Sequence, residues 1–396
     1  MTRRNRLVIR ESVWICGADI TQALRHAISD VKILRERDAK IFLLKNHEDQ
    51  NELEELRKLL NKDVHVILSW LHPKQLAAIK PLLKERKNFS VVADDWWILP
   101  YWFMREADYI LFRKYHGVAV RLGKLPFVGE SQPPWLLDPR PQASKYAMIC
   151  TLLRPAALAI SPIVEAINWW NRHDEEMTPE KCLYLPFGIN CAADMPVKDE
   201  PLLYDFANTA GTIGIWLMRD PYVPFRYTFA NPYHDRQHIT DSIAEFDGKP
   251  FKFYDCRREK DYFLPYDVYL QKCRQTRYVI CTGGLHDAAL PKYLEYACMG
   301  TPIIGRAVPY EHPWQDDCLF SLDTLRPMRK DLKSMLQEAL DVYPKLREKC
   351  LNWRERLLKL YDFHNILDMA QDQADGKPIP SSYLKVESPA GAAKTH

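Results

Sequence analysis

The stretch 281–304 carries residue types that suit a phosphorylated ligand. It reads as a strand, a turn at Gly283 and Gly284, a helix with Pro291 in its first turn and Gly300 at its end, and a second strand. Two glycines let backbone N–H groups approach an anion closely, and the start of the following helix favours negative charge. The turn is therefore either a phosphate-binding loop or a structural connection.

Two carboxylates, Asp287 and Glu295, lie eight positions apart around the start of this helix. A ribose and a hexose both present vicinal hydroxyls, and one carboxylate can accept hydrogen bonds from two of them. On this interpretation Asp287 lies in the loop beside a diphosphate, and Glu295 lies about two turns further along. The alternative makes Asp287 a helix N-cap and Glu295 an exposed helix charge.

Short β-rich runs alternate with amphipathic stretches in both halves of the chain, which predicts parallel βαβ units and an α/β fold. Leucine-rich stripes at helical spacing predict core-facing helices over Asn51–Leu60 and Pro73–Lys87. The expected strands of the first half are Val13–Cys16, Lys40–Leu44, Val64–Trp70, Ser90–Ala93 and Tyr109–Phe112. Those of the second half are Phe206–Thr212, Phe251–Tyr254, Arg277–Cys281, Thr301–Ile304 and Leu319–Ser321.

A chain of 396 residues is long enough for two domains with separate cores. The polar segment Asp194–Pro201 is typical of a linker, so we expect an N-terminal domain over 1–190 and a second domain over 191–345. A C-terminal helix is expected over 346–370, with Pro344 breaking or kinking the helical run before it. Residues 371–396 are polar and rich in Pro, Ser and Ala, which predicts a disordered tail.

The composition indicates an ordinary globular protein, with 47% hydrophobic and 27% charged residues. A net charge of +3 is too small to indicate nucleic acid or an anionic membrane as a partner. The ten cysteines form no C-x-x-C pair, so neither a metal site nor a disulfide framework is expected. Arg10 interrupts the apolar N-terminus, and Arg154 with Pro155 interrupts the longest apolar stretch. We therefore expect a cytoplasmic protein with no transmembrane segment.

The stretch 281–304 resembles the C-terminal half of the group 1 family of retaining glycosyltransferases. That family has the GT-B fold, in which two Rossmann-like domains face each other across a cleft and C-terminal helices cross back to the N-terminal domain. It carries Glu, seven residues and a second Glu, followed by an Ala-Met-Ala-x-Gly-x-Pro run, and Asp287 with Glu295–Pro302 is similar. Asp287 departs from the family's first Glu. Leu185–Asn190 resembles the interdomain connector, and Phe206–Ile215 resembles the first strand and loop of the nucleotide-binding domain.

The resemblance implies a role for each residue of this motif. Asp287 holds the hydroxyls of the donor sugar, and Glu295 binds the ribose. Backbone groups of the turn and the next residues contact the diphosphate or the sugar: Gly283, Gly284, Leu285 and His286.

Further roles follow from position relative to the same family. Arg226, and after it Arg219, is the choice for neutralising the diphosphate, or each is a surface arginine. Tyr254 ends an expected strand, where it either lies near the nucleobase or belongs to the core. Gly17 follows the first strand, where the family's glycine-containing loop faces the acceptor and the donor phosphate. Asp94 is either near the reacting sugar or part of a turn.

The resemblance implies a glycosyltransferase that moves a sugar from a nucleotide diphosphate sugar to an acceptor hydroxyl with retention, Asp287 orienting the sugar and not acting as nucleophile. A UDP-sugar is the favoured co-substrate, with no other cofactor. The acceptor is open: a glycan, a small molecule or a modified nucleic-acid base. One alternative is a DNA-base glycosyltransferase of the same fold, with Arg113, Lys114, Arg121 and Lys124 contacting phosphates. The other is a non-catalytic nucleotide-sugar-binding protein.

Overall fold

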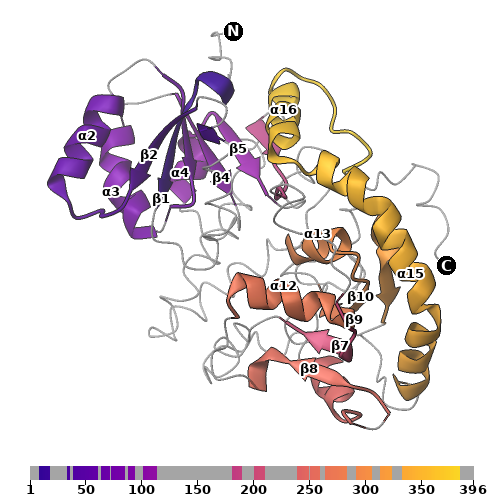
Figure 1. Cartoon of the computed structure of the whole chain (residues 1–396). Helices are drawn as coiled ribbons and strands as arrows, with labels where there is room; N and C mark the ends of the chain where they lie inside the picture. Colours follow the sequence, from indigo (N-terminus) through magenta and orange to yellow (C-terminus); the bar gives the residue numbers. More distant parts are fainter. Residues whose placement is uncertain are drawn as a thin grey trace, which may run out of the picture. The chain divides into compact units, whose positions relative to one another are not determined.

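Both halves of the chain form parallel sheets with flanking helices (Figure 1). The computed structural model describes residues 9–17, 34–35, 39–60, 64–71, 73–84, 88–93, 101–113, 181–189, 200–209, 239–248, 250–258, 264–282, 291–305, 313–322 and 332–383. These residues divide into two units. Unit 1 takes those up to Gly188 together with Phe363–Ile379, and unit 2 takes Ile189–Asp362 and those from Pro380 on.

Unit 1 contains a six-stranded sheet in the order β2-β1-β3-β4-β5-β6, with every neighbouring pair parallel. Five of these strands match the sequence expectation. The sixth, β6, was not expected because it spans three residues and runs directly into the connector. The strands are β1 (Val13–Gly17), β2 (Lys40–Leu44), β3 (Val66–Ser69), β4 (Phe89–Ala93), β5 (Tyr109–Phe112) and β6 (Cys182–Tyr184).

The core of unit 1 lies between its sheet and the helices α2 (Gln50–Leu60) and α3 (Pro73–Leu83). Leu56 of α2 and Ile79 of α3 are both 0% exposed and pack with residues of β1, β3 and β4. The leucine-rich stripes are therefore core, as their spacing predicted. Among the described residues, this unit also contains two short elements before β6, the 3-10 helix η1 (Ile9–Glu11) and α4 (Tyr101–Glu106).

Unit 2 contains a five-stranded parallel sheet in the order β11-β10-β9-β7-β8. Each expected strand of the second half appears, with its ends moved by up to a few residues. The elements are β7 (Tyr204–Asn208), β8 (Phe253–Asp255), η4 (Cys256–Arg258), α12 (Tyr266–Arg274), β9 (Thr276–Cys281), α13 (Pro291–Cys298), β10 (Ile303–Gly305), α14 (Gln315–Cys318) and β11 (Leu319–Ser321). Each unit has a parallel sheet with flanking helices, and this confirms the expected α/β fold class.

The C-terminal helices divide between the two units. Helix α15 (Leu332–Leu360) runs through Pro344 without ending, so the expected boundary at 345 falls inside it. Its face with Leu336 and Ala339 packs on the core of unit 2, and this burial outweighs the one backbone hydrogen bond that proline removes. Helix α16 (Phe363–Ala374) instead packs against β6 of unit 1.

The segment that the sequence assigned to a tail begins inside α16, whose last turn contains residues 371–374. Gln373 is 2% exposed, because its amide binds the backbone of β6. Further along, Tyr383 is 4% exposed, packs its ring against Tyr361 and donates a hydrogen bond to the Leu360 carbonyl. Specific polar contacts therefore hold this polar segment at least as far as Tyr383.

Candidate functional site

The strand order predicts where a ligand binds to each sheet, at the end formed by the carboxyl ends of the strands. In both units the second strand in sequence lies on one side of the first strand, and the third lies on the other. Ligands of such sheets bind in the crevice at the carboxyl ends of the strands where the order reverses. In unit 2 this switch point lies between β7 and β9, which end in Asn208 and Cys281. In the sequence, Gly283 and Gly284 follow β9 after one residue, Thr282.

Glu295, on the second turn of α13, is buried at this switch point. Its side chain is 5% exposed, and its Oε2 accepts a hydrogen bond of 2.6 Å from the hydroxyl of Tyr269 on α12. The alternative interpretation of Glu295 as an exposed helix charge is therefore wrong. A buried carboxylate costs free energy unless it is hydrogen-bonded, so its place in the fold needs a specific partner.

Tyr269 donates its hydroxyl proton to a hydrogen bond with this carboxylate, and it stays protonated over the physiological pH range. Burial, and after it the negative charge of Glu295, raise the pKa of the Tyr269 hydroxyl well above its usual value. The phenol therefore stays protonated at every physiological pH. Tyr269 holds Glu295 in one orientation without neutralising it.

Further polar groups from three elements meet around Tyr269 and Glu295. The hydroxyl of Thr209, just after β7, lies 2.8 Å from the hydroxyl of Tyr296, and the Cys273 sulfur lies 4.0 Å from the same Thr209 oxygen. We call this set the switch-point cluster: Thr209, Tyr269, Cys273, Lys292, Glu295 and Tyr296. Its members come from the end of β7, from α12 and from α13, so the sheet edge and two helices fix it together.

Lys292 is a member of this cluster that sequence reasoning missed. Its Nζ donates a hydrogen bond of 3.2 Å to the carbonyl oxygen of Thr209 and lies 5.2 Å from the centre of the Tyr269 ring. The side chain is half-buried. The available signal was a lysine directly after the helix-starting Pro291, behind the Gly-Gly turn. The switch point thus has one cation and one buried anion on the first turns of the same helix.

Cys273 gives a test of how tightly the switch-point cluster is packed. Burial raises the pKa of its thiol to about 12, and only the thiolate reacts readily with alkylating reagents. We expect iodoacetamide at about pH 8 to leave Cys273 unlabelled in the native protein and to label it in urea. Peptide mass spectrometry reads out both states. Equal labelling in both would mean that the cluster opens freely.

Tyr254 lies in the core and not at the ligand edge. Its side chain is 6% exposed, its ring centre lies 5.3 Å from that of Tyr204, and the Nζ of Lys272 lies 4.9 Å from its ring centre. Side chains alternate across a strand, so Tyr254 faces α12 while the next residue lies at the strand end. The core alternative for Tyr254 is supported.

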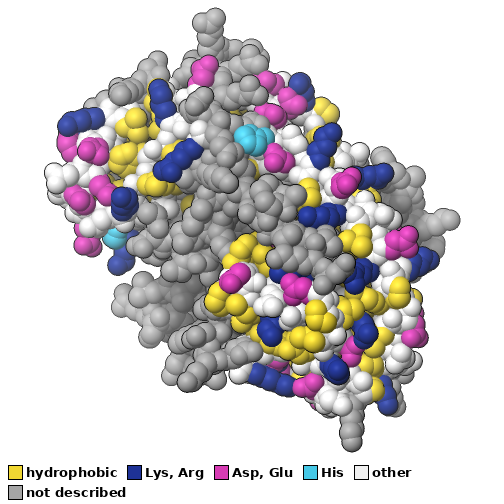
Figure 2. All heavy atoms as spheres, viewed as in Figure 1, with side chains coloured by type: hydrophobic (Ala, Val, Ile, Leu, Met, Phe, Trp, Pro, Cys, Tyr) yellow, Lys and Arg dark blue, Asp and Glu magenta, His cyan; other side chains and the backbone are white. Residues whose placement is uncertain are grey.

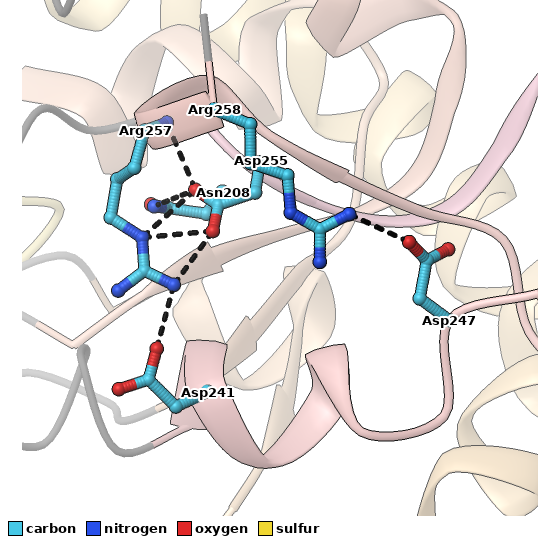
Figure 3. Close-up of polar contacts among 6 residues, drawn as sticks. All are labelled: Asn208, Asp241, Asp247, Asp255, Arg257 and Arg258. Carbon is cyan, nitrogen blue, oxygen red and sulfur yellow. Dashed lines mark hydrogen bonds and ion pairs between the residues drawn. The ribbon is translucent and has the colours of Figure 1, made fainter.

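The polar residue at the end of β8 is Asp255, which sequence reasoning passed over. Its carboxylate accepts hydrogen bonds from Asn208 Nδ2 at 3.0 Å and from Arg257 Nη2 at 2.6 Å, and the same Nη2 donates to Asp241 Oδ1 at 2.7 Å (Figure 3). Burial alone would lower the pKa of Arg257, but the bonds to Asp255 and Asp241 raise it, so the guanidinium stays charged. This group joins the ends of β7 and β8.

In unit 1, the packing around position 17 explains why a glycine occupies it. A Cβ at Gly17 would lie 2.3 Å from the carbonyl oxygen of Trp70 and 2.6 Å from Gln75 Oε1. Gln75 in turn donates its Nε2 to the carbonyl of Leu44 at the end of β2, at 2.8 Å. Glycine therefore allows the ends of β1, β2 and β3 to meet. The predicted contact of Gly17 with acceptor or phosphate stays a prediction.

Arg113, which the DNA interpretation uses as a phosphate contact, is buried. Its side chain is 1% exposed, and its guanidinium carbon lies 5.4 to 5.6 Å from the ring centres of Trp70, Phe187 and Phe363. A phosphate outside the protein cannot reach a group in this position, so Arg113 is a wrong choice for that role. On the face shown in Figure 2, acidic and basic side chains of the described residues are interspersed.

Several expected site residues lie outside the part of the chain that the structure describes. Asp287, the second carboxylate of the motif, is one of them, and its role stays a prediction. The others are Asp94, Arg219, Arg226, Gly283, Gly284, Leu285 and His286, together with Lys114, Arg121 and Lys124 of the DNA interpretation.

No group of three or more His, Cys, Asp or Glu side chains among the described residues could hold a metal ion. No helix among them is long and apolar enough to cross a bilayer.

This chain is similar in structure to several solved proteins. No family model matches this chain, and no curated protein matches it. The structure is similar to that of HepE from Anabaena in complex with UDP, with a TM-score of 0.46 and 10% identity over 93% of this chain and 100% of that chain. The complex of HepE with UDP and glucose gives a TM-score of 0.44 and 10% identity over 92% and 99%. Sucrose-phosphate synthase from Thermosynechococcus elongatus gives 0.42 and 12% over 91% and 98%.

Proposed function

We propose that this chain is a glycosyltransferase that takes a sugar from a nucleotide diphosphate sugar bound at the switch point of unit 2. The observation that carries the proposal is Glu295, a carboxylate 5% exposed and held by Tyr269 beside the carboxyl ends of β7 and β9. This is the acid that the resemblance to the group 1 glycosyltransferases assigns to the ribose. The strand order, which is independent of the resemblance, therefore favours the same place for the ligand.

The chemistry of the carboxylate fits a ribose. A carboxylate has about four acceptor positions, so the hydrogen bond from Tyr269 does not by itself prevent Glu295 from accepting hydrogen bonds from vicinal ribose hydroxyls. Hydrogen bonds to a charged acceptor in a poorly hydrated site are stronger than those between neutral groups. Because Tyr269 fixes the orientation of Glu295 before the ligand binds, binding loses little entropy through ordering of this side chain.

The remaining roles follow the resemblance and belong to this proposal. Asp287 orients the sugar hydroxyls, the Gly283-Gly284 turn contacts the diphosphate, and Arg226 or Arg219 neutralises it as it leaves. Stabilising the charge of a leaving diphosphate is usually a large part of the catalytic effect. We propose transfer with retention, from a UDP-sugar by preference, in the cytoplasm. The acceptor hydroxyl then attacks from the face that the diphosphate leaves, and nuclear magnetic resonance of the product's anomeric proton tests this.

The first experiment is a thermal-shift screen of the full chain against UDP-, GDP-, ADP- and dTDP-sugars. A ligand that binds only the native state stabilises it by about 2.7 kcal/mol at a hundredfold excess over its Kd, so one donor class should raise the Tm. Release of nucleoside diphosphate is then measured with glycans, small alcohols and hydroxymethylated DNA as acceptors. Donor binding with neither transfer nor hydrolysis would instead favour a non-catalytic binding protein.

The second experiment tests the residue that carries the proposal. Glu295→Gln keeps the size of the side chain and removes its charge, and we expect the donor Kd to rise about 10- to 100-fold, because a hydrogen bond to a charged group contributes about 1.5–3 kcal/mol. Isothermal titration calorimetry with the donor found in the screen measures this.

The control is Glu338→Gln, which changes an exposed glutamate of α15 in the same way. We expect it to leave the donor Kd unchanged. Equal affinity of wild type, Glu295→Gln and Glu338→Gln for the donor would overturn the assignment of the site.

A further inference from the structure

We propose that Lys292 binds the diphosphate of the donor and is a specificity-determining residue for diphosphate over the bare nucleoside. This inference rests on the proposed function and deepens it. It gives a role to a side chain that neither the motif nor the resemblance identified.

The ammonium group of Lys292 lies at the carboxyl end of β7. Its Nζ is 3.2 Å from the carbonyl oxygen of Thr209, the residue that directly follows this strand. The end of β7 is one side of the switch point, and the end of β9 is the other. In sheets of this order the phosphates of a nucleotide bind in the crevice between these two strand ends. Lys292 therefore brings a positive charge to the place where the topology puts the phosphates.

Lys292 is also held in position. Its Nζ lies 5.2 Å from the centre of the Tyr269 ring, whose hydroxyl binds Glu295. A cation over an aromatic face keeps its charge while it loses side-chain freedom. The half-buried setting lowers the local dielectric constant, so its attraction for a phosphate is stronger than that of a fully exposed lysine.

The spacing between Lys292 and Glu295 suits a nucleoside diphosphate. The two residues are three positions apart on α13, so their side chains lie on the same face of the helix. In a nucleoside diphosphate the first phosphate is an ester of the 5′ hydroxyl of the ribose that carries the vicinal 2′ and 3′ hydroxyls. A carboxylate on the ribose and an ammonium group on the phosphates therefore need to be neighbours, as these two are.

The other described cations near these strands have different surroundings. The charge of Arg257 is offset by two carboxylates. Lys272 lies over the rings of Tyr204 and Tyr254, at 5.4 and 4.9 Å. Lys272 therefore serves as the control, because it is a second lysine over tyrosine rings in the same unit, and these rings are not the ring of Tyr269.

The test compares Lys292→Met with wild type by calorimetry, using the nucleoside, monophosphate and diphosphate of the base selected in the donor screen. We expect the diphosphate Kd to rise about 10- to 100-fold, since a charged hydrogen bond is lost, while the nucleoside Kd stays within about twofold. Lys292→Arg keeps the charge and should recover most of the diphosphate affinity. Lys272→Met should change neither Kd, and the Tm of each variant checks its folding.

Three outcomes would count against the proposal in distinguishable ways. If Lys292→Met weakens nucleoside and diphosphate equally, Lys292 acts only by positioning Tyr269 and Glu295, and the inference is overturned. If it weakens neither while Glu295→Gln weakens both, the inference fails and the proposed function stands. If wild type binds no nucleoside diphosphate at all, the proposed function fails and this inference fails with it.

Discussion

Gly305→Ala is expected to lower the free energy of unfolding by about 3 kcal/mol, which combines the cost of a strained backbone with that of an overpacked contact. Gly305 ends β10 with φ +147, and a Cβ there would lie 2.0 Å from the carbonyl oxygen of Cys281. The clash is with backbone, and Cys281 is the register partner of Gly305 on β9. Relief therefore requires the two strands to separate. Urea unfolding followed by tryptophan fluorescence measures the loss as a lower midpoint.

A matched glycine separates strain from clash. Gly248 has φ +84 and open space around the position of a Cβ, so Gly248→Ala should cost only about 1 kcal/mol. Cys281 is the last residue of β9, directly before Thr282 and the Gly-Gly turn, so Gly305→Ala should also weaken donor binding. Equal losses of stability for the two variants would show that the close approach of β9 and β10 does not matter.

Much of this fold could be predicted because several of its strands are fully buried. Strand β3, for example, is buried at all four positions and stands out as an apolar run, and the same holds for β5. Strand β6 has three residues and is followed at once by the connector, so it gives no such run. Local preference predicts a break or a kink at Pro344, and α15 continues through it because its apolar face packs on the core of unit 2.

The candidate site could be predicted only where its residues are close in sequence. Glu295 follows the Gly-Gly turn on the next helix, so the motif identifies it. Its partner Tyr269 lies on α12, before β9, and only the folded chain brings the two together. Tyr254 was open between a nucleobase contact and the core, and only the folded chain supports the core alternative, because one step along a strand changes the face of the sheet. The spacing of residues along the sequence does not show which residues far apart in the chain come into contact.

Gln373→Leu tests how α16 is attached to unit 1. The Oε1 of Gln373 accepts a hydrogen bond of 2.8 Å from the Tyr184 N–H, and its Nε2 donates one of 2.7 Å to the Tyr184 carbonyl. The side-chain amide thus pairs with the edge strand β6 as a neighbouring strand would. Leucine leaves both buried backbone groups without these partners, at about 1–3 kcal/mol each, so we expect stability to fall by about 3 kcal/mol.

Amide hydrogen exchange measures this loss at the contact itself. The Tyr184 amide should exchange about 100-fold faster in Gln373→Leu, because every 1.4 kcal/mol of opening free energy changes its protection about tenfold. Gln337→Leu, which changes an exposed glutamine of α15, should alter stability by less than about 0.5 kcal/mol. Unchanged protection of Tyr184 in Gln373→Leu would mean that packing of residues such as Ile366 and Leu367 holds α16 to the sheet without the amide. Loss of protection confined to β6 and α16 would instead identify the pair as the part of unit 1 that opens first.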